Sequence, residues 1–536
     1  MSRELHSAEH GTRLLELRVL DGPNRFFTRP AVKLEFANEH PGAAVESAAS
    51  AGLAVRRLHV ALGMPAPTLT SRRSEDDRRA LIAFPWRRRT IGQAIGAAAS
   101  RLALGESAEE AELAALRAMA LGPRPSLPRI HVPIVAVTGT NGKSTTSRLI
   151  AHVAGSIGLA VGMTNSDGIY LRGELVEAGD WTGFGGARRV LGERGLQLAV
   201  LETARGGILL RGVGYAHDDV AVVTNISSDH LGLQGIDTLD ELAEVKAAIV
   251  RITRPAGWAV LNADDRRVWA MRRETPAHWY AFSMQPRTPA VEEAIESGGR
   301  AAVLERGWLV LLAPGSRPVR LVPAAELPMT LGGRARHNVA NALAAAAACD
   351  ALGLDRGGVA AGLRSFALNP EANPGRLNLY RRDDVLVVVD FAHNEAGLVA
   401  LLDTARALTG GDGQGCVRLA LGTAGDRSDE VLRSLAEEAG RHSDDLLIAE
   451  KPHYLRGRSR ESMNELLRAG AAASGMEAEI EVQPSEVAAL STLLGRARAG
   501  DVVVVMCHAE REEVGAWLRH NGFAALDAAA LSSFPS

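Results

Sequence analysis

The stretch 134–146, IVAVTGTNGKSTT, holds the residues with the clearest chemistry in this 536-residue chain. A β-branched run enters a glycine loop, and Leu149, Val153 and Ile157 then recur every fourth position, as on one face of a helix. Loop N–H groups and a helix N-terminus bind phosphates, a lysine reaches the terminal phosphates, and a hydroxyl ligates Mg²⁺. The pattern favours a phosphate-binding loop for ATP and Mg²⁺ over an ordinary glycine turn. Its expected nucleotide contacts are Gly139, Thr140, Asn141, Gly142, Lys143, Ser144 and Thr145.

Two further polar positions follow apolar runs that read as buried strands. Glu202 comes after Leu196–Leu201, and the pair Asp229-His230 comes after Val220–Thr224. Open α/β sheets bind ligands at the carboxyl ends of their strands. Glu202 is therefore predicted as a second Mg²⁺ ligand, and His230 as an imidazole that serves the metal. A solvated glutamate and a structural cap are the alternatives.

A second group of candidate nucleotide contacts lies farther along the chain. Asn341 shares a helix face with Asn338, and an amide offers the donor and acceptor that an adenine edge requires; capping by Asn338 is the alternative. Asp390 follows the apolar run Val385–Val389 and is predicted to accept ribose hydroxyls. Arg376 is predicted to stabilise charge on a transferring phosphoryl group.

Lys246 is the candidate with the least usual chemistry. Thr238-Leu239-Asp240-Glu241 has the capping-box pattern, so a helix should begin there and place Lys246 on one stripe with Leu242 and Ile249. Burial would lower its pKa and make the neutral amine available to CO₂. A lysine that reaches solvent from the edge of the stripe is the alternative.

The run 451–460, KPHYLRGRSR, is strongly basic. Its default interpretation is a solvated surface, and the functional alternative is a landing site for an anionic acceptor or peptide.

Several of these segments resemble, in the right order, motifs of the Mur ligase superfamily, and especially the ligase region of cyanophycin synthetases. They are TGTNGKST at 138–145, ETARGG at 202–207, TNI and DHLG between 224 and 232, HN and N at 337–341, GR at 375–376, DFAHN at 390–394 and GTAGDR at 422–427. Phe391 stands where the family usually has tyrosine. The resemblance covers about residues 127–536, and the start of the chain looks like the N-terminal domain of those synthetases.

The resemblance implies an α/β, Mur-ligase-like fold. Its parts would be a small α+β N-terminal domain (1–125), a P-loop central domain (126–367) and a Rossmann-like C-terminal domain (368–536). It implies metal ligation by Ser144, Glu202, His230 and a carbamylated Lys246, and catalytic roles for Lys143, Lys246, Arg376 and His230. Substrate contacts are implied for Thr164, Asp167, Arg205, His393, Asn394, Asp426 and Arg427.

The elements that would position these residues alternate in type. In the first 125 residues, Leu14–Val19, Ala31–Phe36 and Ala80–Trp86 read as strands, and Ile91–Leu104 and Ala108–Leu121 as helices, before a proline-rich linker at 122–128. From Ile134 onward strand-like runs alternate with helical stretches, which predicts mainly parallel, doubly wound sheets. The linker leaves no room for the ATP-grasp domain that cyanophycin synthetases carry at this point.

Net charge and composition limit the kinds of molecule that the chain is expected to bind. A formal net charge of −3 supports neither nucleic-acid nor membrane binding, and no uncharged run approaches a membrane span. Three scattered cysteines and a polar start without a signal peptide suggest a cytoplasmic protein. A homo-oligomer is possible.

The predicted activity is that of an ATP-dependent amide ligase. A carboxylate of a small molecule or peptide would attack the γ-phosphate to give an acyl phosphate and ADP, and the amine of an amino acid would then form the amide. A UDP-muramyl or folyl-type ligase and a nucleotide-binding regulator that has lost ligation are the alternatives.

Overall fold

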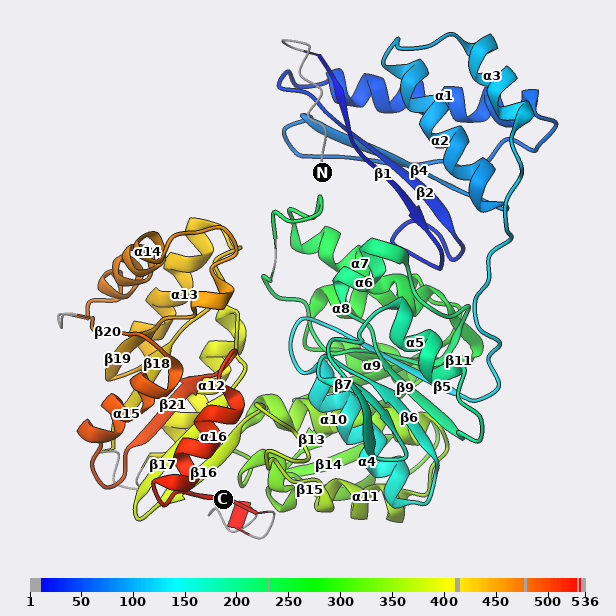
Figure 1. Cartoon of the computed structure of the whole chain (residues 1–536). Helices are drawn as coiled ribbons and strands as arrows, with labels where there is room; N and C mark the ends of the chain where they lie inside the picture. The colour runs from blue at the N-terminus through cyan, green and yellow to red at the C-terminus, as the bar shows by residue number, and fades with distance from the viewer. Residues whose placement is uncertain (1–10, 230, 410–414, 477–479, 528–529, 532–536) are drawn as a thin grey trace.

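The computed structural model describes residues 11–229, 231–409, 415–476, 480–527 and 530–531. Its strands form three sheets, of four, eleven and seven strands. The sheets follow one another along the chain, and the first lies on one end of the second while the third lies beside it (Figure 1). Hydrogen bonds between the side chains of Asn141 and Asn394 join the part of the chain with the second sheet to the part with the third.

The first sheet is antiparallel, and helices cover one of its faces. Its order is β1 (Arg13–Leu20), β2 (Ala31–Ala37), β4 (Arg79–Pro85), β3 (Thr70–Arg73). Helices α1 (Ala43–Ala61) and α2 (Arg89–Ala103) pack on it, and α3 (Glu109–Ala118) packs against α2. Val32 and Leu34 of β2 enter this core. Because side chains alternate along a strand, Lys33 and Glu35 face the other side.

The second sheet is parallel at its centre and antiparallel at both ends. Its order is β15 (Val319–Pro323), β14 (Trp308–Leu312), β13 (Arg300–Glu305), β12 (His278–Ser283), β11 (Thr253–Asn262), β10 (Asp218–Val223), β5 (Ile134–Thr138), β9 (Leu198–Glu202), β6 (Val161–Thr164), β7 (Gly168–Leu171), β8 (Glu174–Ala178). The seven central strands, which are β6, β9, β5, β10, β11, β12 and β13 in sheet order, are mutually parallel.

Helices cover both faces of the second sheet. They are α4 (Lys143–Ser156), α5 (Phe184–Leu191), α6 (Arg205–Arg211), α7 (Leu239–Arg251), α8 (Arg266–Ala270), α9 (Pro289–Glu296), α10 (Arg336–Ala351) and α11 (Arg356–Ser365). Val135 and Val137 of β5 share a core with α4 and α10, whereas Ile134 and Ala136 share the opposite core with α5 and α7. Side-chain alternation therefore makes β5 a fully buried strand.

The third sheet is again mainly parallel. Its order is β20 (Val482–Gln483), β19 (Asp445–Ala449), β18 (Val417–Leu421), β21 (Val502–Met506), β17 (Val385–Asp390), β16 (Asn378–Arg382), β22 (Ala524–Ala525). Its helices are α12 (Glu395–Leu408), α13 (Asp429–His442), α14 (Arg460–Ala473), α15 (Glu486–Arg496) and α16 (Arg511–His520).

The predicted strands and helices named above are present, with ends shifted by a few residues. The capping box at Thr238 is confirmed, because Thr238 Oγ1 accepts from Glu241 N at 3.2 Å and Glu241 Oε2 accepts from Thr238 N at 3.2 Å. Helix α1 and strand β3 were not expected. Residues 119–133, between α3 and β5, contain no helix or strand. Among the described residues, no helix has both the length and the apolarity to cross a bilayer.

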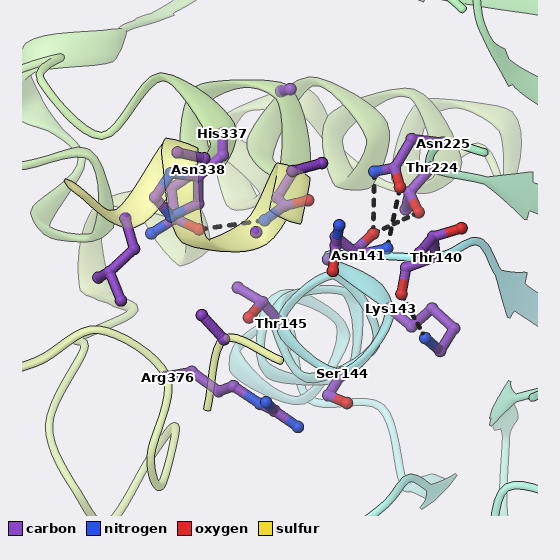
Figure 2. Close-up of a pocket in the computed structure, with 18 of the residues that line it drawn as sticks. Thr140, Asn141, Lys143, Ser144, Thr145, Thr224, Asn225, His337, Asn338 and Arg376 are labelled. Atoms are coloured by element: carbon purple, nitrogen blue, oxygen red, sulfur yellow. Dashed lines mark hydrogen bonds between the residues drawn. The ribbon is translucent and has the colours of Figure 1, made fainter. Parts of the chain in front are cut away.

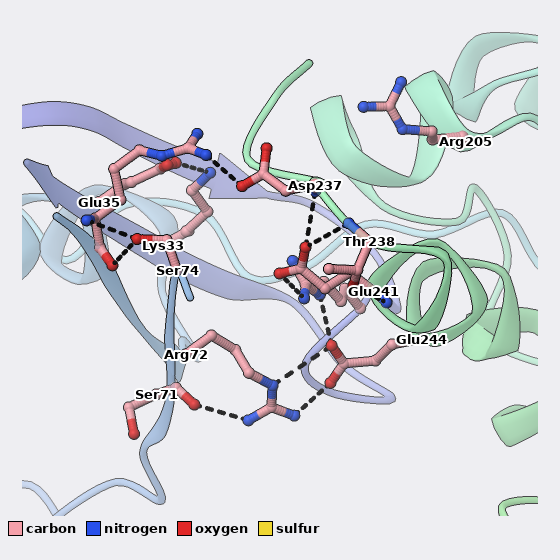
Figure 3. A network of polar contacts seen from close by, with 12 residues as sticks. Lys33, Glu35, Ser71, Arg72, Ser74, Arg205, Asp237, Thr238, Glu241 and Glu244 are labelled. Carbon is pink, nitrogen blue, oxygen red and sulfur yellow. Dashed lines mark hydrogen bonds and ion pairs between the residues drawn. The ribbon is translucent and has the colours of Figure 1, made fainter. Parts of the chain in front are cut away.

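Ion pairs join the uncovered face of the first sheet to the second part of the chain (Figure 3). Arg25, whose side chain is 3% exposed, donates to Glu241 at 3.1 Å and to Glu244 at 2.7 Å. Arg72 also pairs with Glu244, and Arg79 pairs with Asp237. The start of α7 is thus joined to the first part of the chain by ion pairs that range from the buried Arg25 to Arg72, which is 42% exposed.

Burial of the side chain of Asp218, the first residue of β10, reduces the stability of the folded chain. Its side chain is fully buried, and neither carboxyl oxygen accepts a hydrogen bond from a described residue. Burial raises its pKa from the usual 3.8 to about 8, against smaller opposing effects of Thr253 and Arg254. Between these values the folded chain holds a proton that the unfolded chain has lost. This group therefore lowers stability as pH rises, by up to about 1.4 kcal/mol per pH unit.

Asp218→Asn should remove this dependence. Its advantage over wild type in urea midpoint should be small at pH 5 and grow steadily toward pH 8. Asp219→Asn is the matched control, because Asp219 accepts from Ile134 N at 2.8 Å and pairs with Arg254, so its loss should destabilise throughout this range. An Asp218→Asn advantage that is equal at pH 5 and pH 8 would contradict the prediction.

Candidate active site

The phosphate-binding loop curves through two positions that admit no side chain. Gly139 has a φ of 146° and Gly142 a φ of 84°. A Cβ on Gly139 would lie 1.9 Å from Thr224 Oγ1, and one on Gly142 would lie 2.2 Å from Asn341 Oδ1. Glycine is therefore required twice, both for backbone conformation and for space.

Thr224 and Asn225, which follow β10, hydrogen-bond to the glycine loop (Figure 2). Asn225 accepts from Thr140 N through its backbone carbonyl at 2.8 Å and from Asn141 N through its side chain at 2.9 Å. Thr224 Oγ1 donates to the carbonyl of Asn141 at 2.6 Å. These contacts fix the loop without using the N–H groups at the start of α4.

The loop opens on a pocket of about 290 Å³ between the second and third sheets. Predicted nucleotide contacts line it, together with residues that sequence reasoning did not select, such as Asn225, Phe391 and His337. The predicted residues in the lining are Thr140, Asn141, Gly142, Lys143, Ser144, Thr145, Asn341, Arg376, Asp390 and His393. The pocket therefore gathers residues from Thr140 to Leu401, which are 261 positions apart in sequence.

The residues predicted to bind metal include one buried carboxylate with an unused oxygen. Glu202 is 3% exposed, and its Oε2 has no hydrogen-bond partner among the described residues. Burial raises its pKa, whereas Lys143 and the Ser144 hydroxyl lower it. Ser144 Oγ lies 3.3 Å from Ser166 Oγ. Hydroxyl and carboxylate oxygens are the donors that Mg²⁺ prefers, so these residues fit that ion. His230 lies outside the described residues.

Lys246 is buried, and the alternative of a lysine that reaches solvent is wrong. It is 3% exposed, and its Nζ donates to the carbonyl of Gly139 at 2.6 Å. Burial, together with the charge of Lys143, lowers its pKa well below the usual value. Lys143 itself donates from Nζ to the carbonyl of Thr140 at 2.7 Å. Both amines therefore lie at the phosphate-binding loop.

Three arginines surround Asp167. Arg148 of α4 reaches its Oδ2 at 3.1 Å, and Arg511 of α16 reaches its Oδ1 at 3.0 Å. Burial alone would raise the pKa of Asp167, but Arg376, Arg511 and Arg148 together lower it. Arg376 Nη2 also lies 3.4 Å from Ser166 Oγ. Arg148 and Arg511 were missed because no local motif marks them; only the fold brings them to Asp167.

Asp390 has a structural role in the same region. Its two oxygens accept from Leu377 N and Ala392 N, each at 2.7 Å, and burial raises its pKa. The guanidinium of Arg376 lies 4.4 Å from the ring centre of Phe391. Asp390 thus fixes the two segments that carry Arg376 and Phe391, and each oxygen retains a lone pair toward the pocket.

Residues of the third sheet also contact the loop segments of the second. Asn394 caps α12 and exchanges two amide hydrogen bonds with Asn141, at 2.9 and 3.0 Å. Asp229 lies 3.6 Å from His393 Nε2 and 3.5 Å from Arg427 Nη1. The predicted substrate contacts His393, Asn394 and Arg427 therefore lie at the junction between the two sheets.

The other predicted substrate contacts lie outside the pocket lining. Thr164 is buried at the carboxyl end of β6, and Arg205 begins α6 and donates to the carbonyl of Leu233. Asp426 lies 3.5 Å from Arg456.

Asn341 faces Gly142 and donates to Asn338 Oδ1 at 3.0 Å. Its amide contacts the loop backbone and its neighbouring helix turn.

The basic run 451–460 is only partly a solvated surface. Lys451 is buried and donates to Glu486 and to the carbonyl of Met506. Arg458 donates to Asp429 at 2.8 Å and to the carbonyls of Gly425 and Arg427 at 3.2 and 3.0 Å. The default interpretation is therefore wrong for these two residues, which support the neighbouring 425–429 loop.

His337 shows a buried polar group that no motif explained. Burial lowers its pKa from 6.5 to about 4, and its Nδ1 has no hydrogen-bond partner in the described part of the chain. A neutral imidazole at the pocket wall can accept or donate one hydrogen bond to a ligand.

Comparison with known proteins agrees with this geometry. The model of the Mur ligase middle domain matches residues 137–349, and that of the Mur ligase glutamate ligase domain matches residues 375–508. A cyanophycin synthetase of Trichormus variabilis is 40% identical over 70% of this chain and 41% of its own length. The chain thus spans about two fifths of that relative.

Two further relatives show the breadth of the family. A UDP-N-acetylmuramyl-tripeptide synthetase of Deinococcus radiodurans is 34% identical over 60% of this chain and 63% of its own. A bifunctional folylpolyglutamate synthase/dihydrofolate synthase has a similar fold, with a TM-score of 0.53 at 20% identity over 72% of this chain and 89% of its own. The chain belongs to the Mur ligase superfamily.

Proposed function

We propose that this protein is an ATP-dependent ligase that joins a carboxylate to an amine through an acyl phosphate. The observation that carries the proposal is the shared pocket. The glycine loop with Lys143 and Ser144 lines this pocket together with Arg376 from the third part of the chain. The buried carboxylate of Glu202, whose Oε2 has no partner among the described residues, lies within the electrostatic reach of these three side chains. Relatives named as synthetases and ligases that join amino acids or peptides support the same chemistry.

The chain's own residues would divide the work as follows. The N–H groups of 139–144 and Lys143 bind the phosphates of ATP. Ser144, Glu202, His230 and a carbamylated Lys246 would hold Mg²⁺, which would neutralise phosphate charge. Asp390, His337 and Asn341 lie where the nucleoside would bind. Because phosphoryl transfer needs mainly positioning and charge neutralisation, these contacts account for most of the expected acceleration.

Charge that develops on the transferring group would be stabilised by Arg376. Its position depends on Asp390 and Ser166, which link the third sheet to the second. The carboxylate substrate would enter beside Thr164 and Asp167, within the field of Arg148, Arg376 and Arg511. The amine would approach from His393, Asp426 and Arg427, and His393, 3.6 Å from Asp229, would take its proton.

We propose a small-molecule or peptide carboxylate and an amino-acid amine. The segment 119–133 leaves no room for a further domain between the first sheet and the ligase region. We therefore propose only the Mur-type ligation, without a second ATP-dependent step of the ATP-grasp kind.

A phosphate-release assay tests the proposal. Purified protein with Mg-ATP is screened against amino acids paired with short acidic peptides, UDP-muramyl peptides and folates. Release that requires both an acid and an amine, with a product heavier by the amine minus water, supports ligation. Nucleotide binding without acid-dependent release in any pair supports a regulator that has lost ligation.

Lys143→Ala should lower acid-dependent phosphate release by about 100-fold or more, because an ammonium that neutralises phosphate charge is removed from a closed site. Thermal unfolding should change little, since Lys143 contributes only one hydrogen bond to the fold. Arg188→Ala, on the exposed side of α5, is the control. Turnover near that of wild type in the lysine variant would remove the loop from the mechanism.

Lys246→Ala should lose most activity, and acetate should restore part of it, because a small carboxylate can replace the carbamate that we propose on Nζ. Lys143→Ala with acetate is the matched control and should stay inactive. Mass spectrometry of the native protein under bicarbonate should show the added CO₂ only when Lys246 is present. Full activity of Lys246→Ala would contradict the assignment of a carbamate to Lys246.

Ligands should bring the second and third sheets together. In the structure Asn141 contacts Asn394, and Asp167 pairs with Arg511, so the two parts are joined beside the proposed ligand sites. Ligands that bind there should stabilise this joined arrangement, and small-angle scattering should then show compaction with an ATP analogue and the acid substrate. Arg511→Ala should weaken this compaction, whereas Glu513→Ala on the same helix should leave it unchanged. Identical scattering of wild type with and without ligands would contradict domain closure.

A further inference from the structure

A large groove on the first part of the chain has no role in the proposed function. It has a volume of about 910 Å³ and shares no lining residue with the nucleotide pocket. The end of α1, the end of β4, the start of α2, the end of α3 and the linker form its walls. It belongs to the helical layer, which lies on the side of the first sheet away from the second sheet (Figure 1).

The charge of the groove has one sign. Its lining includes the arginines 29, 87, 88, 117 and 124 and contains no Asp or Glu. Of these, the side chains of Arg29, Arg87 and Arg124 make no ion pair or hydrogen bond with another described residue. Arg88 and Arg117 make only long contacts with the carbonyls of Gly122 and Ala61, at 3.3 and 3.4 Å. The guanidinium groups are therefore available to an anionic ligand.

The floor of the groove is apolar and continues to its rim. Trp86, Ile91 and Leu116 are buried beneath it. Met119 and Leu121 in the wall are 42% and 53% exposed, which places them among the most exposed large apolar residues described. Exposed apolar side chains beside arginines and an aromatic are typical of surfaces that bind protein segments.

The linker wall is fixed in place. Leu121 and Pro123 accept backbone hydrogen bonds from Ile91 N and Arg89 N, at 3.2 and 2.9 Å. Between them, Gly122 has a φ of 80°, and a Cβ there would lie 2.1 Å from Thr90 Oγ1. The groove thus exists before any ligand binds, which lowers the entropic cost of binding.

From this geometry we infer that the groove is a docking site for an acidic peptide segment that also carries apolar side chains. Its carboxylates pair with Arg29, Arg87 and Arg124, and its apolar side chains cover Met119 and Leu121. A bare inorganic anion would use the arginines and leave the apolar wall exposed. The occupant is therefore a peptide segment of a partner, and the site is separate from ligation.

The test measures fluorescence anisotropy of a short labelled peptide that alternates Asp or Glu with Leu, titrated with the full chain. Binding should weaken as salt increases. Arg87→Glu and Arg124→Glu should each weaken it about tenfold, as expected when a charge-assisted hydrogen bond becomes a repulsion. Leu121→Ser should weaken it with the arginines intact. Arg56→Glu, an exposed arginine of α1 outside the groove, is the matched control.

Controls separate this site from the active site and from other occupants. Arg87→Glu should keep wild-type ATP turnover, and Lys143→Ala should keep peptide binding, so either function can fail alone. Equal binding of an all-aspartate peptide or of tripolyphosphate would overturn the inference, as would preference for DNA or for anionic vesicles. Self-association that Arg87→Glu abolishes would show a second copy as the occupant and overturn it too. No binding by a protein that turns over ATP normally would do the same.

Discussion

The phosphate-binding loop depends on two positions where no side chain fits. Gly139 approaches Thr224 and Gly142 approaches Asn341, so the end of β10 and the helix α10 determine the curve of the loop. Lys246 donates to the carbonyl of Gly139, and Asn394 exchanges hydrogen bonds with Asn141. Groups from the second and third sheets therefore take their positions from one short backbone segment. A side chain at either glycine would displace several of them together, and this explains why so much polar structure surrounds a loop of few residues.

Several ionisable side chains in the same region are buried, and burial disfavours their charged forms. The pKa of Glu202 and of Asp390 is raised and that of Lys246 is lowered, because a low-dielectric site favours the neutral form of each group. Asp167 behaves in the opposite way, since three arginines outweigh its burial. Perturbed groups gathered at one pocket are typical of sites that bind charged ligands. A divalent cation and a polyphosphate would supply partners for the groups that the chain itself leaves uncompensated, notably the free oxygen of Glu202.

Sequence predicted most of this fold because its signals are local. Strand-like runs such as Val385–Val389 and the capping box at Thr238 are present where expected. Helix α1 was missed since its many alanines blur the apolar stripe, and β3, Thr70–Arg73, carries no apolar residue at all. At the site, the loop residues could be named from spacing. Arg148 and Arg511 could not, because their common partner Asp167 lies 19 residues from one and 344 from the other. Lys451 was misjudged for a related reason: its buried partner Glu486 lies on another element.

Besides its ion pairs with α7, the first part of the chain contacts the segment that leads to Asp229. Lys33 and Glu35 form an ion pair on the uncovered face of the first sheet, and Glu35 lies against Gly235, while Arg79 pairs with Asp237. Residues 231–237 connect this face to Asp229, which contacts His393 and Arg427 of the third part. Arg205 donates to Leu233 within the same segment. A rigid shift of the first sheet therefore has to move this segment or break its charged contacts. The side chains of Arg79 and Asp237 are 34% and 35% exposed, so this pair alone contributes little, and the restraint comes from the several contacts acting together. The first sheet consequently restrains the segment that leads to Asp229 and to its contacts with His393 and Arg427.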